Sequence, residues 1–365
     1  MQTIRQWLSD LVSRLLPNSQ AVSFALLLLV GSIAVVSLGR ILMPVFAAGI
    51  IAYFLETLVA MGVRQRLPRM ASVVVVYLFF LALLVIVLVG LLPLLYHQTE
   101  ELIGQIPAMI NSGQDLVMQL PRRYPHFITQ DQIHEIMGAI RQEIVTYSQG
   151  LLSYSYASIV SVITLIVYLI LVPLLVFFFM KDKDLISQWV SQFLPRERNL
   201  YDRVWREVDS QIGNYVRGKF FEIGLLFVTS YVTFALMGLN YALLLAFLIG
   251  LSVITPYIGA TVVTFPVMIV AFFQWGWADD FWYLMLAYGI IQSLDGVVLV
   301  PLLFSEVVNL HPVAIMVAIL FFGGNWGFWG VFFAIPLATL VHSVMTAWPK
   351  STDAGQLGQP ISTSL

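Results

Sequence analysis

The sequence predicts an all-α protein that crosses a membrane several times. Of its 365 residues 59% are hydrophobic and only 10% are charged, the mean hydropathy is +0.89, and several apolar runs extend over roughly 20 residues. A soluble domain is about 45–50% apolar and about 25% charged, and a transmembrane helix needs about 20 apolar residues. The apolar excess is too large for a buried core alone. We therefore expect a polytopic inner-membrane helical bundle with about eight transmembrane helices.

The composition and the motif content argue against several other classes of protein. The net charge of −2 gives no reason to expect a nucleic-acid partner. The chain has no cysteine, so disulfides and thiolate chemistry are excluded. The sequence also lacks a phosphate-binding Gly-rich loop, a His-x-x-x-His pair and a Gly-x-Ser-x-Gly motif. We expect no enzyme activity, no catalytic residue, no cofactor and no metal site.

Along the chain, apolar runs alternate with polar segments and define five regions. The third of them contains a basic helix that is expected to lie along the membrane surface, with Val204, Val208, Ile212 and Tyr215 on one face. The regions are an amphipathic lead-in with three spans (1–97, the spans at 21–38, 41–60 and 71–96), a small amphipathic helical domain (98–152), a fourth span and a basic surface helix (153–219), a C-terminal transmembrane core (220–348) and a tail expected to be disordered (349–365).

The distribution of Lys and Arg predicts the orientation. With the N-terminus in the cytoplasm, thirteen of these residues fall inside and four outside, before Lys350 in the tail is counted. Positive charge is concentrated on the cytoplasmic side of membrane proteins. We expect both termini in the cytoplasm, the 98–152 domain in the periplasm, and the bacterial inner membrane as the location.

Two apolar runs are too long for one upright span. The run at 241–273 is interrupted by Thr255-Pro256-Tyr257-Ile258-Gly259, and the run at 312–348 by glycines between Gly323 and Gly330. Proline removes a backbone donor, and glycine permits backbone conformations that other residues rarely adopt. Each run is either a kinked span or a hairpin that enters and leaves on one side. The loose helix ends either face a transport path or only shape the fold.

Polar residues inside the apolar runs are the candidate site. A carboxylate at mid-membrane costs about 2.5–3.5 kcal/mol on insertion scales, so Asp295 either binds a cation, a proton or a polar solute, or is buried with a hydrogen-bonding partner. Glu56 is an intramembrane acid or an interfacial one, and Lys219 with Glu222, on the same helix face, has a functional role or forms an interfacial salt bridge. The candidates for the path or gate are Pro256, Tyr257, Gly259, Gln292, Asp295, Gly296, Pro301, Glu306, Asn309, His311, Pro312, Gly323, Gly324, Asn325 and Gly327.

These motifs together resemble the autoinducer-2 exporter family of permeases, closest to its PerM-like branch. The resemblance covers nearly the whole chain. The motifs that carry it are Arg217-Gly218-Lys219 with Glu222, Pro256-Tyr257-Ile258-Gly259, Gln292 with Asp295-Gly296 and Pro301, Asn309-Leu310-His311-Pro312, Gly323-Gly324 with Gly327, and Ile335-Pro336.

The resemblance implies about eight transmembrane helices and assembly into homo-oligomers such as pentamers. Some members of the family are implicated in export of the signal autoinducer-2, and others in sodium or lithium/proton antiport. The chain departs from the family at Ala260, where many members have proline, and at Val297, where many have asparagine. The second departure removes a polar group beside Asp295.

The function expected from residues and resemblance together is that of a permease. It would move a small polar metabolite or signal across the inner membrane, with or without coupling to an ion or proton. The alternatives are a monovalent cation/proton antiporter, a channel-like homo-oligomer, and a non-transporting envelope scaffold that acts through residues 98–152. The expected partners are the lipid bilayer, a small polar solute or monovalent cation, and further copies of the chain.

Overall fold

The described part of the chain consists of helices and the turns that join them, which confirms the predicted all-α class. The structure is a computed structural model and describes residues 19–117, 138, 159–192, 199–256, 258–304 and 310–347. Within these residues five helices are long and apolar enough to cross a membrane, or six if one bent pair forms a single span. The lead-in before residue 19, the tail after residue 347 and most of the 98–152 domain lie outside the described residues.

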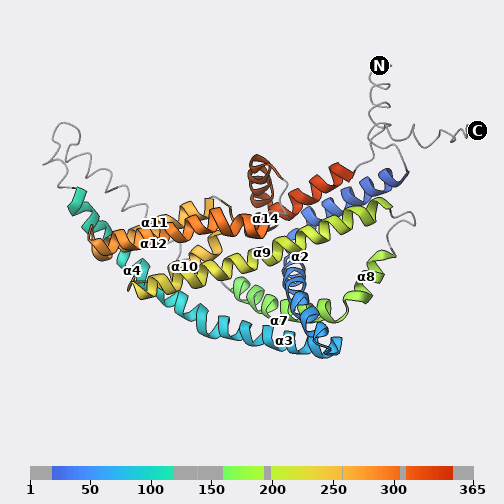
Figure 1. Cartoon of the computed structure of the whole chain (residues 1–365), viewed down its shortest axis with the longest axis horizontal. Helices are drawn as coiled ribbons and strands as arrows, with labels where there is room; N and C mark the ends of the chain where they lie inside the picture. The colour runs from blue at the N-terminus through green and yellow to red at the C-terminus, as the bar shows by residue number, and fades with distance from the viewer. Residues whose placement is uncertain are drawn as a thin grey trace, which may run out of the picture. The chain divides into compact units, whose positions relative to one another are not determined.

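The chain divides into two compact units. The first comprises residues up to 66, 175–220 and 299 onward, and the second comprises 67–174 and 221–298. The helices in chain order are α2 (Ser19–Arg64), α3 (Arg69–Val85), the π-helix η1 (Ile86–Leu91), α4 (Leu92–Val117), α7 (Ile159–Lys181), α8 (Lys183–Ser191), α9 (Asn199–Leu236), α10 (Ala242–Ser252), α11 (Ile258–Trp275), α12 (Asp279–Leu294), the π-helix η2 (Asp295–Leu299), α13 (Val300–Phe304) and α14 (Pro312–Ala347). Figure 1 labels the α-helices of this series except α13.

The second unit has an apolar core and apolar outer faces. Leu245, Val267 and Leu284, from three different helices, belong to one buried cluster and are fully excluded from solvent. Large side chains on the outside are apolar too, as Val89 and Leu286 show with 72% and 64% of their surface exposed. Contiguous exposed apolar surface marks contact with lipid or a partner. This arrangement is that of a multi-pass membrane protein.

Several helices are longer than the sequence indicated. The first two apolar runs lie in one helix, α2, where a turn was expected near residue 40; α2 is 46 residues long, contains Pro44 and bends along its length (Figure 1). Proline removes one hydrogen bond of the helical ladder and produces such bends. Likewise, α4 continues the third span through η1 with Pro107 inside the helix. The predicted boundary at residue 98 is therefore not a break in the helix.

The predicted surface helix is also part of a longer element. Residues 199–236 form one helix, α9, that continues into the fifth span. Tyr215, expected on a lipid-facing side, is only 1% exposed, and its hydroxyl donates to the carbonyl of Phe332 at 3.3 Å. Amphipathic spacing shows that one face prefers to be buried. Here part of that face packs against protein.

The first overlong run forms a helical hairpin, because α10 and α11 fold back on each other. Near the end of α11, the Gln274 side chain accepts a hydrogen bond from the Asn240 N–H at 2.8 Å and donates one to the Gly238 carbonyl at 2.7 Å. These contacts join the start of the run to its end. The hairpin therefore enters and leaves at the same end. With 11 residues, α10 is about 16 Å long, roughly half the hydrocarbon thickness of a bilayer.

The second overlong run is broken sharply at the predicted glycines. Gly327 has φ 60° and ψ −137° inside α14, a conformation that side-chain-bearing residues rarely adopt. A Cβ atom placed on Gly330 would overlap the carbonyl oxygen of Phe322. In a straight helix, residues eight positions apart are separated by about 12 Å along the axis. The two arms of α14, residues 312–328 and 330–343, therefore meet at the break.

Candidate functional site

Polar side chains of the second unit meet where α11 packs against α12. Tyr288 on α12 is 2% exposed, and its hydroxyl lies 2.9 Å from Thr264 Oγ1 on α11. One turn further along α12, Gln292 Nε2 donates to the same hydroxyl at 2.8 Å. Thr264 Oγ1 also lies 2.7 Å from the carbonyl of Ala260. We call these four residues the Tyr288 chain.

The hydrogen bonds of the Tyr288 chain run in one direction. The Ala260 carbonyl can only accept, so the Thr264 hydroxyl donates to it. Since the Thr264 hydrogen is used there, the Tyr288 hydroxyl donates to Thr264 and accepts from the Gln292 amide. Successive hydrogen bonds in such a chain polarise one another, and each is electrostatically stronger in an apolar interior than in water. The result is an ordered polar row across an apolar unit.

Asp295 extends the polar face of α12 by a further turn. It is the first residue of η2, its backbone N–H bonds to the carbonyls of Gln292 and Ile291, and its Oδ1 atom is buried. Pro301 follows shortly in α13 and has no N–H for the ladder. Single π turns inside helices are frequent at functional sites. The predicted group of Gln292, Asp295 and Pro301 thus lies along an irregular stretch of helix.

The Tyr288 chain ends at the tip of the α10–α11 hairpin. Ala260 follows Gly259, whose N–H donates to the Thr255 carbonyl at 2.9 Å. The structure thus brings the predicted hairpin motif and the predicted Gln292 region into one unit. The residues that connect them, Thr264 and Tyr288, were not singled out from the sequence. A threonine and a tyrosine in apolar helices look like ordinary core residues, and only the spacing of Tyr288 and Gln292, four positions apart, signals a shared face.

Other predicted residues lie elsewhere. His311 precedes α14, is exposed, and its Nδ1 accepts the N–H of Val313 at 3.3 Å, so it caps the helix. Asn325 Nδ2 donates to the Phe321 carbonyl at 2.7 Å, within its own helix. Lys219 and Glu222 on α9 are 3% and 2% exposed, so both charges of the family motif are buried. Tyr257, Glu306 and Asn309 lie outside the described residues.

The other predicted residues are glycines, which differ in the space around them, and Pro312. Gly296, Gly324 and Gly327 have open space around the position that a Cβ atom would occupy, whereas a Cβ on Gly323 would press on Val331. Pro312 is exposed at the start of α14. Within the described ranges, no three His, Asp or Glu side chains lie close enough together to hold a metal ion.

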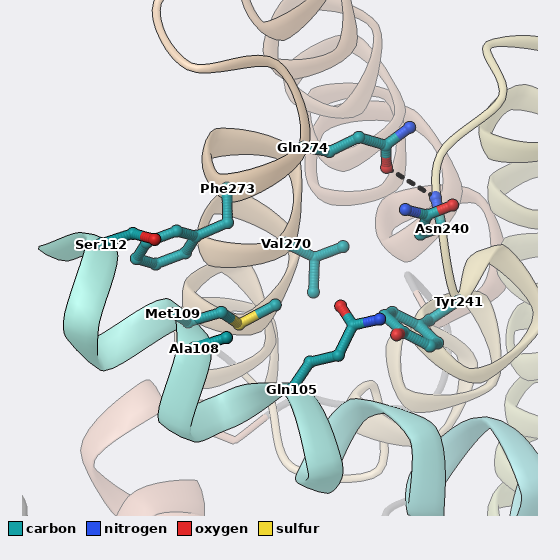
Figure 2. A pocket seen from close by; sticks show the side chains of 9 residues that line it. All are labelled: Gln105, Ala108, Met109, Ser112, Asn240, Tyr241, Val270, Phe273 and Gln274. Carbon is teal, nitrogen blue, oxygen red and sulfur yellow. Dashed lines mark hydrogen bonds between the residues drawn. The ribbon is translucent and has the colours of Figure 1, made fainter.

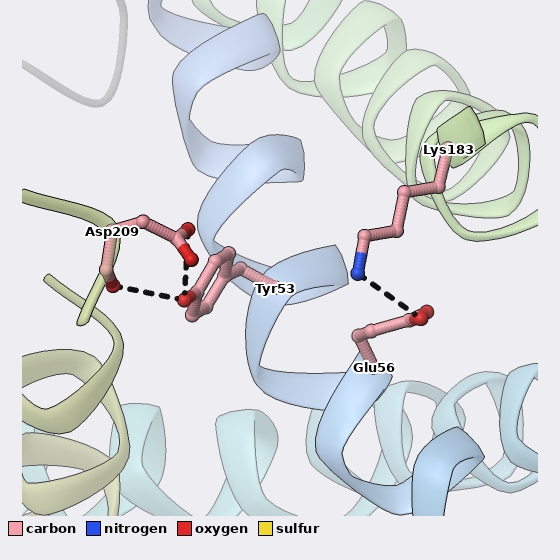
Figure 3. Close-up of polar contacts among 4 residues, drawn as sticks. All are labelled: Tyr53, Glu56, Lys183 and Asp209. Carbon is pink, nitrogen blue, oxygen red and sulfur yellow. Dashed lines mark hydrogen bonds and ion pairs between the residues drawn. The ribbon is translucent and has the colours of Figure 1, made fainter. Parts of the chain in front are cut away.

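Polar contacts in the first unit hold α2 to its neighbours (Figure 3). The Tyr53 hydroxyl lies 3.1 Å from the Asp209 carboxylate and 3.0 Å from its backbone carbonyl, and Lys183 Nζ lies 3.4 Å from Glu56 Oε1. Lys183 is half exposed, so the ion pair contributes less than about 1 kcal/mol. The structure therefore places Glu56 in an ion pair with the first residue of α8.

A pocket of about 190 Å³ lies in the second unit between α4 and the open end of the hairpin (Figure 2). Its polar lining is neutral: Gln105 and Ser112 on α4, Asn240 and Tyr241 before α10, and Gln274 on α11. Burial raises the pKa of Tyr241, and the nearby Glu101 carboxylate raises it further, so its hydroxyl stays neutral. The pocket thus offers amide and hydroxyl groups beside the apolar side chains of Met109, Val270 and Phe273.

Removing the Tyr288 hydroxyl should destabilise the second unit. Tyr288→Phe keeps the buried ring but leaves the Gln292 amide and the Thr264 hydroxyl without their shared partner, and an unsatisfied buried polar group costs about 1–3 kcal/mol. We expect a lower melting temperature for the purified protein in detergent. Tyr283→Phe is the matched control, because Tyr283 is on the same helix and 62% exposed. Equal melting temperatures of the two variants would show that the Tyr288 chain contributes nothing measurable to the stability of the protein.

The apolar bundle, its two broken runs and the internal polar row define a multi-pass membrane protein with the architecture of a transporter. Comparison with known proteins agrees: the chain belongs to the family described as "AI-2E family transporter", which matches residues 22–350. It is 41% identical to "Putative permease PerM" of Escherichia coli K12 over 363 residues, and this alignment covers 98% of this chain and 99% of that protein. It is 25% identical to "Putative transport protein YueF" of Bacillus subtilis over 314 residues, an alignment that covers 85% of this chain and 84% of that protein.

Proposed function

We propose that the chain is a permease that moves a small polar solute along the α11–α12 face of the second unit. The observation that carries the proposal is the Tyr288 chain, an ordered row of hydrogen-bonding groups next to a broken helix. Polar groups inside a membrane are costly, and they commonly mark a solute or ion path. Transporters also place their binding sites at interrupted helices. Membership of a transporter family supports the same conclusion.

The pocket favours a neutral solute over a strongly charged one. Its nine lining residues include three carboxamides, a serine and a tyrosine, and none carries a charge. Such groups both donate and accept hydrogen bonds, so they suit hydroxyl and carbonyl groups of a solute. The pocket lies in the same unit as the Tyr288 chain. We propose it as an outer collection point for the solute, on the side that the Lys and Arg distribution assigns to the periplasm.

A second candidate function, cation or proton coupling, is favoured by Asp295. Its carboxyl group lies in an apolar helical stretch at the start of a π turn, three residues after Gln292. A carboxylate in that place can hold a proton or a monovalent cation in one state and release it in another. In this version Asp295 carries the coupling ion while the Tyr288 chain orders the path beside it.

The proposal includes a location and an assembly. The chain would lie in the bacterial inner membrane with both termini in the cytoplasm, which the thirteen-to-four distribution of positive charge supports. It would work as a homo-oligomer, which the family resemblance supports.

Flux through liposomes that contain the purified protein tests the proposal. The vesicles are loaded with sodium, lithium or a small neutral polyol, with and without a pH gradient. If Asp295 carries the coupling ion, Asp295→Asn should lower gradient-driven flux by about tenfold or more, which corresponds to about 1.4 kcal/mol. Asp280→Asn is the control, because Asp280 is exposed in the first turn of the same helix.

Each outcome separates the two candidates. Polyol flux that does not depend on the gradient, and that persists in Asp295→Asn, supports an uncoupled permease. Gradient-driven flux that is unchanged in Asp295→Asn excludes Asp295 as the carrier. If no load moves in the wild-type protein, the permease proposal fails for these solutes.

A further inference from the structure

The short helix α8 leaves the end of α7 at a steep angle. The part of α7 at 165–181 and α8 differ in direction by 79° across a one-residue break. Helices that cross a membrane tilt by about 20° on average from the bilayer normal. Because α7 is apolar and, with 23 residues, long enough to cross a membrane by itself, the bend brings α8 close to the plane of the membrane surface. The surface helix that the sequence predicts around residues 204–215 lies further along the chain, in α9.

One face of α8 is apolar and uncovered. Leu185 and Trp189, four positions apart, have 65% and 60% of their surface exposed, and Val190 has 46%. Ile186 completes this apolar side, while Gln188 and the serines lie opposite. In water such a face would be unfavourable, since each large apolar side chain gains about 1.5–3 kcal/mol on burial. A tryptophan beside leucine and valine is typical of the membrane–water boundary.

The charges around α8 balance. Lys181, Asp182, Lys183 and Asp184 sum to zero, Lys181 Nζ lies 3.8 Å from Asp182, and Lys183 is paired with Glu56 of α2. Figure 3 shows Lys183 pointing from α8 toward Glu56, so the first turn of α8 is tied to α2. A segment without net charge gains little from anionic headgroups. Any attraction of this helix to a bilayer must come from its apolar face.

We propose that α8 is an interfacial helix that inserts Leu185, Trp189 and Val190 into the headgroup–acyl boundary where α7 leaves the bilayer. The occupant of the exposed face is the lipid surface itself, and the insertion depends on apolar burial and not on lipid charge. Amphipathic helices of this kind sit about 5–10 Å into the boundary. The inference is independent of what the protein transports.

The absence of cysteine from the chain makes the test direct. Leu185→Cys and Ser187→Cys variants of the full chain are spin-labelled and reconstituted in liposomes, and collision rates with oxygen and with a water-soluble nickel chelate are measured. Residues two positions apart in a helix point to nearly opposite sides, and a helix with its side chains is about 10–12 Å across, so the label at 185 should lie about 10 Å deeper than the label at 187. Val190→Cys provides a second site on the apolar face.

The depth difference should be the same in zwitterionic and in anionic vesicles. Equal access of nickel to positions 185 and 187 would overturn the proposal, because both faces would then be in water. Shielding of position 185 from both oxygen and nickel would also overturn it, since that result indicates a protein contact. Insertion only in anionic vesicles would contradict a mechanism based on apolar burial.

Discussion

Replacing Gly259 with alanine should open the tip of the α10–α11 hairpin and destabilise the protein by about 3 kcal/mol or more. The new Cβ atom would overlap the carbonyl oxygen of Ser252, a backbone atom that cannot rotate away. The tip would have to widen, which breaks the hydrogen bond from Gly259 to Thr255. We expect a large drop in melting temperature and faster hydrogen exchange at residues 252–264. The shift of Ala260 would also disturb its contact with Thr264.

Gly289→Ala is the matched control for this prediction. Gly289 lies inside α12, in the same unit, and a Cβ atom there would meet open space. Alanine is more favourable than glycine in a helix by up to about 1 kcal/mol, so this variant should be as stable as the wild type or slightly more stable. If Gly259→Ala melts at the same temperature as Gly289→Ala, the inference that the hairpin tip is too tightly packed for a Cβ atom at residue 259 is wrong.

Replacing Gly330 with alanine should have a comparable effect on the first unit, again about 3 kcal/mol or more. Its Cβ atom would overlap the carbonyl oxygen of Phe322, where the two arms of α14 meet. The same Cβ atom would lie only 3.0 Å from the backbone nitrogen of Gly323, so backbone atoms leave little room on this side. We expect the arms to separate, which is measurable as a lower melting temperature and as new proteolytic cleavage between residues 322 and 331.

Gly324→Ala provides the comparison within the same helix, because nothing lies within contact distance of a Cβ atom at that position. It should leave the melting temperature and the proteolytic pattern unchanged. A Gly330→Ala protein that resists the protease as well as Gly324→Ala does would show that the arms of α14 are not in close contact.

The sequence by itself determined the fold class and the positions of the breaks in the two overlong runs. An apolar content of 59% leaves too little polar surface for a soluble fold, and closely spaced prolines and glycines weaken a helix locally. These are properties of single residues and of local composition. For that reason the break at Thr255–Gly259 and the break near Gly327 were both predictable without a structure. The polar character of Asp295 and Gln292 in an apolar run was visible in the same way.

Only the tertiary structure decided how the runs fold and which residues meet. A broken run can be a kinked span or a hairpin, and Gln274 binding back to Gly238 and Asn240 selects the hairpin. The contact between Thr264 and Tyr288, 24 positions apart, has no signature in either helix. Periodicity indicates that a face prefers to be buried, but it does not name the partner, as Tyr215 of α9 and the uncovered face of α8 show. Partner choice depends on packing between distant segments, which local spacing does not encode.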